Sequence, residues 1–155
     1  MKIIFTIIFI FILLFFQVGI LPNLAIFNAF PNLILLSILS LCILKEPRQI
    51  IGWIIFGGLF LDIYSLSDFL GISIISLFLA GSIAYFLSQN LFKKSTKSSL
   101  LTVFLISIFF YNVFLAFLFK IAGTGFYFGF LNFITNIFYN LALSLPVFGL
   151  IKKLC

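Results

Sequence analysis

Acidic residues and histidine are what this sequence has least of. Of its 155 residues, three are aspartate or glutamate, none is histidine, and 8% are charged. Soluble globular domains average roughly 25% charged residues, so the composition excludes a soluble domain. The lack of histidine excludes a Ser-His-Asp or Cys-His nucleophile and any histidine-ligated metal site. The two cysteines, Cys42 and Cys155, form no metal or redox spacing.

Long hydrophobic runs take the place of charge, and 65% of the residues are hydrophobic. Runs of about 20 apolar residues are typical of transmembrane helices. We therefore predict an all-α integral membrane protein, a six-transmembrane-helix bundle formed by a single domain over 1–155. The expected spans are 3–21, 32–44, 50–64, 69–92, 100–119 and 127–151. The first run is too long for a cleaved signal peptide and no small-x-small site precedes Leu21.

The basic residues predict the orientation of these spans. The net charge is +6, and the bases stand at the ends of apolar runs. If the N-terminus lies in the cytoplasm, eight of the nine Lys and Arg residues fall on the cytoplasmic side, and Lys120 alone falls outside. The positive-inside rule then predicts a multi-pass protein with both termini cytoplasmic. We expect these bases to contact membrane lipids with anionic headgroups rather than nucleic acid.

One carboxylate, Asp62, is predicted to lie within the membrane. It follows the glycine pair Gly57 and Gly58 in an otherwise apolar run, and a charge inside a bilayer costs at least a few kcal/mol. Two interpretations stay open. Asp62 either accepts backbone N–H bonds at the turn into the next span, or belongs to a polar cluster inside the bundle. Asp68 is expected to be the N-cap of that next span.

The second interpretation involves three asparagines at a similar depth. Asn112 lies as far into the fifth span as Asp62 does into the third, and Asn132 and Asn136 bracket that level in the sixth. Asparagine is unfavourable against lipid and is expected to face other helices or a partner. We therefore predict a cluster of Asp62, Asn112, Asn132 and Asn136 in the outer half of the bundle, with Lys120 as the candidate counter-charge.

Small and polar residues also recur every fourth position in two spans. A helix places such residues on one face, and helices in lipid associate through small and amide-bearing faces. We expect both faces to pack between helices. The two sets are Ser76, Ala80, Ala84 and Ser88, and Asn132, Asn136, Asn140 and Ser144.

An ordered set of motifs resembles the rod shape-determining protein MreD family. The set comprises PNLILL from Pro31, a basic turn with Arg48, the run IGWIIFGGLFLDIYSLSDFLG from Ile51, and Tyr139-Asn140 ahead of Pro146. One departure is Asn32, where that family often has aspartate. The positions that match are Pro31, Arg48, Gly52, Gly57, Gly58, Asp62, Ser65, Gly71, Asn140 and Pro146.

The resemblance implies a non-enzymatic scaffold without a cofactor. Such proteins sit in the bacterial inner membrane within the cell-wall elongation machinery, where they support lateral peptidoglycan synthesis and cell shape. The implied partners are the bitopic protein MreC and, through it, MreB, RodA and a class B penicillin-binding protein. The implied fold is similar to the substrate-binding subunit of energy-coupling-factor transporters.

That vitamin-binding subunit is also the main alternative function. It would need a ligand pocket near the outer face and an Ala-x-x-x-Ala docking face on the first span, and residues 3–21 contain no alanine. An intramembrane enzyme is disfavoured, because the only carboxylates are Glu46, Asp62 and Asp68 and no nucleophile motif or second base accompanies them. An ion carrier that uses Asp62 alone is a further alternative.

Overall fold

The computed structural model describes residues 12–13, 15–25, 29–65, 69–91, 96–123 and 129–154, and no strand occurs within these ranges. The all-α prediction is confirmed for this part of the chain. The elements are the π-helix η1 (Phe16–Ile20), the 3-10 helix η2 (Leu21–Leu24), α2 (Leu33–Leu44), α3 (Pro47–Tyr64), α4 (Ile72–Phe86), the π-helix η3 (Leu87–Leu91), α5 (Lys97–Ile121) and α6 (Phe130–Leu154).

Among the described residues, three helical stretches are long and apolar enough to cross a membrane: Ile72–Asn90, Lys97–Ile121 and Phe130–Lys153. The sequence predicted six crossings, which is more than these three helices show. The helix α2 has 12 residues, about 18 Å at the usual rise, which is short of the ~30 Å hydrocarbon core. Most of the predicted span 3–21 lies outside the described residues, so the count of six stays a prediction.

The start of α4 differs from the prediction. The helix begins at Ile72, and its N-cap is Gly71, which has a φ of 108°. Glycine adopts this left-handed conformation without the steric penalty of a Cβ. The expectation that Asp68 would be the N-cap is therefore wrong, and Asp68 itself lies outside the described residues.

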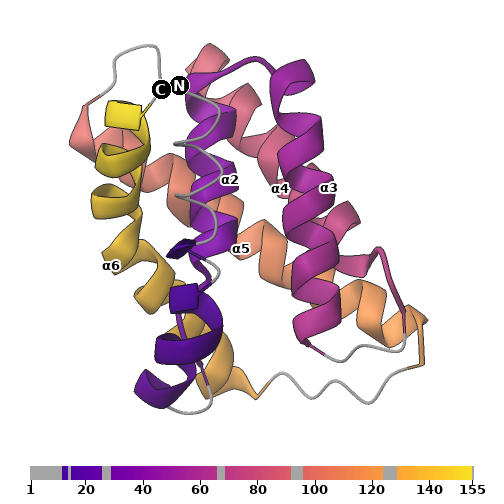
Figure 1. Cartoon of the computed structure of the whole chain (residues 1–155). Helices are drawn as coiled ribbons and strands as arrows, with labels where there is room; N and C mark the ends of the chain where they lie inside the picture. The colour runs from indigo at the N-terminus through magenta and orange to yellow at the C-terminus, as the bar shows by residue number, and fades with distance from the viewer. Residues whose placement is uncertain are drawn as a thin grey trace.

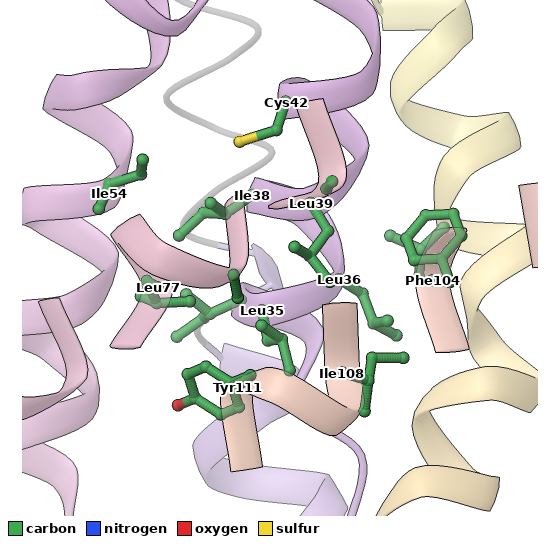
Figure 2. Close-up of a cluster of buried hydrophobic side chains, with 14 of the residues drawn as sticks. Leu35, Leu36, Ile38, Leu39, Cys42, Ile54, Leu77, Phe104, Ile108 and Tyr111 are labelled. Atoms are coloured by element: carbon green, nitrogen blue, oxygen red, sulfur yellow. The ribbon is translucent and has the colours of Figure 1, made fainter. Parts of the chain in front are cut away.

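The short helix α2 lies at the centre of the bundle and contacts α3, α4 and α6, while α5 packs against α4 and α6 (Figure 1). The sequence of α2, LILLSILSLCIL, has no polar face, as expected for a helix surrounded by others. Figure 2 shows its side chains among residues of the neighbouring helices. The buried residues labelled there include Leu35, Leu36, Leu39, Leu77, Phe104 and Ile108.

Two glycines of α3 allow this helix to approach its neighbours closely. A Cβ on Gly58 of α3 would lie 2.6–2.8 Å from Ile74 of α4, including its backbone N and Cα. A Cβ on Gly57 would lie 2.8–2.9 Å from side-chain atoms of Ile38 and Ile34 in α2. Real Cβ atoms do not come this close, so the α2–α3–α4 packing requires glycine at both positions.

The basic residues of the described helices gather at one end. The α2–α3 connection and the end of α6 lie at the same end of the bundle in Figure 1. Lys120, in the last turn of α5, lies at the other end. This arrangement agrees with the positive-inside pattern, while the side of the membrane that each end faces stays a prediction. The bases at the common end are Lys45, Arg48, Lys97, Lys152 and Lys153.

Candidate functional site

Two helices, α2 and α4, begin inside the bundle. The first N–H groups of any helix have no partner within that helix, and a buried N–H without a hydrogen bond is costly. In lipid no water is at hand to replace the missing acceptor. Side chains from other elements therefore have to supply the acceptors, and they do so at both helix starts.

At the start of α2 the acceptors are three amide oxygens. Asn32 is the N-cap, and its Oδ1 accepts from the Leu35 N–H at 2.9 Å. The Asn32 N–H donates to Oδ1 of Asn140 at 2.8 Å. The Leu33 N–H donates to Oε1 of Gln17 at 2.7 Å. Gln17 and Asn140 are 1% and 0% exposed, so η1 and α6 both close over the beginning of α2.

A chain of amides extends from Asn140 across α6 to α5. The Nδ2 group of Asn140 donates to the backbone oxygen of Asn136 at 2.8 Å and to its Oδ1 at 2.9 Å. The same Oδ1 accepts from Nδ2 of Asn112 at 3.2 Å, and Asn112 also donates to the Ile108 carbonyl at 2.9 Å. These amides join α5 and α6 to the cap of α2.

At the start of α4 the acceptor is the carboxylate of Asp62. Its Oδ2 accepts from the Gly71 N–H at 2.6 Å and its Oδ1 from the Ser73 N–H at 2.9 Å. Asp62 is 0% exposed and belongs to the last turn of α3, where the helix dipole disfavours an anion. The N-terminus of α4 carries the opposite partial charge and offsets this effect.

Tyr111 of α5 connects the two caps. Its hydroxyl interacts with the side chains of Ser73 and Asn32, and Asp62 is its electrostatic partner. Both capped helix starts therefore belong to one set of buried and half-buried polar groups, which we name the polar layer. Its members are Gln17, Asn32, Asp62, Ser73, Tyr111, Asn112, Asn136 and Asn140.

The polar layer contains three of the four residues predicted to cluster. Asn112 and Asn136 bond to each other, and Asp62 lies in the same layer through Tyr111. The direct bonds of Asp62 to backbone N–H groups agree with the capping interpretation. Asn132 is half-buried, and its side chain makes no hydrogen bond within the described ranges. Lys120 is exposed at the end of α5, and the charge compensation that the structure shows comes from the start of α4.

The remaining motif residues lie along α2, α3 and α6. Pro31 is buried just before the N-cap of α2, and Arg48 is exposed in the first turn of α3. Gly52 has open space where a Cβ would be. Ser65 is the C-cap of α3 and its hydroxyl donates to the Asp62 carbonyl at 3.1 Å. Pro146 lies inside α6, on an exposed position.

Gln17, Ser73 and Tyr111 are members of the polar layer that sequence reasoning missed. Gln17 could have been predicted, because a glutamine within an apolar run, like the asparagines, is unfavourable against lipid and is expected to face other helices. Ser73 donates through its backbone N–H, a group that every residue except proline has, so its identity as serine does not predict this bond. Tyr111 is one of many aromatic residues in a chain that is 20% aromatic, so its hydroxyl does not stand out.

The groups of the polar layer are engaged in holding backbone and amide groups in place. Within the described ranges no three His, Cys, Asp or Glu residues come together as a metal site. Comparisons with protein-family models, with curated proteins and with solved structures found no match to this chain. Its function is therefore argued from its own residues.

Proposed function

We propose that this chain is a non-enzymatic scaffold of the MreD type, a multi-pass protein of the bacterial inner membrane in the cell-wall elongation machinery. In this role it supports lateral peptidoglycan synthesis and cell shape. Its partners would be MreC and, through it, MreB, RodA and a class B penicillin-binding protein. The proposal includes six crossings with both termini in the cytoplasm.

One observation carries this proposal. The segments that carry the motifs are far apart in the sequence and meet in space, since the N–H of Asn32, the one departure from the family pattern, bonds to Asn140 across 108 positions. Asp62 and Gly71, from the central motif, bond to each other. Buried helix starts need acceptors in any bundle, and here two of the side chains that supply them, Asp62 and Asn140, belong to the MreD-like motifs. The convergence supports a shared architecture for which these residues are required.

The distribution of side chains supports a role in holding other membrane proteins. Large apolar residues are exposed on the outer faces of the helices, among them Phe56, Phe117 and Phe138. The connections between described helices are short, as the two residues between α2 and α3 illustrate. A partner would therefore be met in the plane of the membrane. Among the three long apolar helices of the described ranges, α6 is the least covered, since 28% of its apolar stretch is buried against 39% for α5 and 44% for α4.

The vitamin-transporter alternative receives less support. A substrate-binding subunit needs convergent polar or aromatic groups around a pocket near its outer face. In the described part of the chain, the polar groups of the outer half are bonded to one another in the polar layer. A pocket between α3 and α4 lies toward the opposite end and is lined mainly by apolar residues.

Co-purification tests the proposal. The tagged chain is extracted from bacterial membranes with a mild detergent, and the associated proteins are identified by mass spectrometry. We expect MreC and other wall-elongation proteins to be recovered, and to be lost when Asn140 is changed to Ala. The Ser82→Ala variant is the matched control, because the Ser82 hydroxyl bonds only within its own helix. Recovery of transporter ATPases in place of wall proteins would overturn the proposal in favour of the alternative.

A further inference from the structure

A narrow apolar crevice separates α3 and α4 near the end of the bundle that carries Lys45 and Arg48. Its walls include Ile51 and Ile54 of α3 and Phe78 and Ser82 of α4, and Cys42 of α2 forms its floor. The crevice is distinct from the polar layer, which lies where α3 ends and α4 begins.

The crevice follows from the way α3 and α4 pack. Near Asp62 the two backbones come together at Gly58 and Ile74. Toward the other end Gly81 of α4 packs closely on α2, and this position leaves no room for a side chain. A Cβ there would lie 2.8 Å from the Cys42 sulfur and 3.8 Å from Cδ1 of Ile54. Figure 2 shows Cys42 and Ile54 on this side of the bundle.

The crevice opens on the outer surface of the bundle. Ile51 and Phe78, on its two walls, are 44% and 50% exposed. In a bilayer this surface meets lipid tails, and an apolar slot between helices is a complementary shape for one of them. A lipid chain in the slot would shield apolar surface that α3 and α4 do not cover with each other.

A cationic residue, Arg48, lies on α3 one turn before the crevice residue Ile51. Arg48 precedes Ile51 by three residues, so the two side chains lie on the same face of α3, and Arg48 is exposed. Tyr85, half-buried, is on the α4 wall at the same end. Basic pockets between transmembrane helices on the cytoplasmic side bind anionic lipid headgroups, and Tyr is enriched at the membrane–water interface.

We propose that the α3–α4 crevice is a binding site for one anionic two-chain phospholipid. One acyl chain lies in the crevice against Ile54 and Phe78, and Arg48 binds the phosphate of the headgroup. The site does not depend on the scaffold function, and requires only that the bundle lies in a membrane with the end that carries Arg48 at the headgroup level.

The test is a lipid titration of the delipidated protein in mild detergent. Phosphatidylglycerol and phosphatidylcholine with identical acyl chains are added separately, and native mass spectrometry counts the bound molecules. We expect one tightly bound phosphatidylglycerol and at least fivefold weaker binding of phosphatidylcholine. Arg48→Gln should weaken phosphatidylglycerol binding about fivefold and leave phosphatidylcholine binding unchanged. Ser82→Leu, which places a side chain in the crevice, should weaken binding of both lipids.

Two control variants separate a site from general lipid contact. Lys152→Gln removes a charge at the same end of the bundle but on α6, and Ala142→Leu adds bulk to an exposed position of α6. Both should bind lipid like the unchanged protein. Equal effects of Arg48→Gln and Lys152→Gln, or equal binding of the two lipids, would overturn the proposal. Arg48 is exposed in the first turn of α3, so we expect Arg48→Gln to fold normally. If Ser82→Leu fails to elute as a monodisperse protein, the comparison of Arg48→Gln with Lys152→Gln still tests the proposal.

Discussion

Asp62 accepts hydrogen bonds from the N–H groups of Gly71 and Ser73, and these bonds explain how a carboxylate is kept at 0% exposure. Hydrogen bonds to a charged acceptor contribute more than neutral ones. The sequence indicated that Asp62 is buried, because it stands in an apolar run. Its partners could not be read from the sequence, because backbone N–H groups are common to every residue.

Replacing Asp62 by Leu should destabilise the bundle by about 2–5 kcal/mol, because two buried N–H groups lose their acceptor. Asp62→Asn should have a smaller effect, since its amide oxygen can still accept one of the two bonds. The thermal unfolding midpoint of the purified protein in detergent gives the order. Equal midpoints for Asp62→Leu and the unchanged protein would show that the cap is not required.

Two buried serine hydroxyls, unlike the carboxylate of Asp62, have no bonding partner among the described residues. Ser76 Oγ and Ser107 Oγ are buried and have no hydrogen-bond partner within the described part of the chain. The hydroxyl of Ser40, in contrast, bonds to the carbonyl of Leu36 one turn earlier. A buried hydroxyl without a partner is unfavourable.

Ser76→Ala and Ser107→Ala should therefore each raise the thermal midpoint, by an amount corresponding to about 1 kcal/mol. Ser40→Ala, which removes a satisfied hydroxyl, should leave the midpoint unchanged or lower it. The three variants are compared in the same detergent. A lower midpoint for both Ser76→Ala and Ser107→Ala would indicate that a buried water binds these hydroxyls.

Among the elements, α3 is positioned by its glycines. Gly58 packs directly on the backbone of Ile74, whereas nothing lies within 4 Å of a Cβ at Gly52. The sequence predicted both glycines as motif residues but could not distinguish them, because the distinction depends on which face of α3 meets α4. The same limit applies to Asn132 and Asn136, which share a stripe although only Asn136 bonds to a neighbouring helix.

This pair gives an internally matched test. Gly58→Ala should lower the thermal midpoint, by an amount corresponding to about 1–3 kcal/mol, because α3 and α4 have to move apart. Gly52→Ala should raise it by an amount corresponding to about 0.5–1 kcal/mol, because alanine is the better helix former and the site has space. Both changes add one methyl group to the same helix. A fall of similar size in both variants would contradict the packing described here.

Helix boundaries show what apolar patterning can and cannot predict. Four predicted spans correspond to α2, α3, α5 and α6 within a few residues, because apolar runs and basic turns mark them. The start of α4 was predicted too early, since Asp68 looked like an N-cap while the backbone of Gly71 forms it. The polar layer was only partly predictable. The depth of a residue in the membrane follows from its number of residues from the end of the span, but the direction in which its side chain points does not.

For the whole molecule, the orientation of the bundle is open to a direct test. A fluorescent protein or alkaline phosphatase is fused after Lys153, and a second fusion is placed after Lys120. We expect fluorescence without phosphatase activity at the first position and phosphatase activity at the second, because the bases of one end remain in the cytoplasm. Phosphatase activity at Lys153 would contradict the predicted topology.

The long sequence separation between α2 and α6 has a consequence for biogenesis. The Asn32 N–H has no acceptor until Asn140 is translated 108 residues later, so α2 enters the membrane before this hydrogen bond can form. The insertion machinery or a membrane chaperone would have to shelter the start of α2 in the meantime. A chain that stops before Asn140 would leave it uncovered, and membrane quality-control proteases would be expected to remove that product.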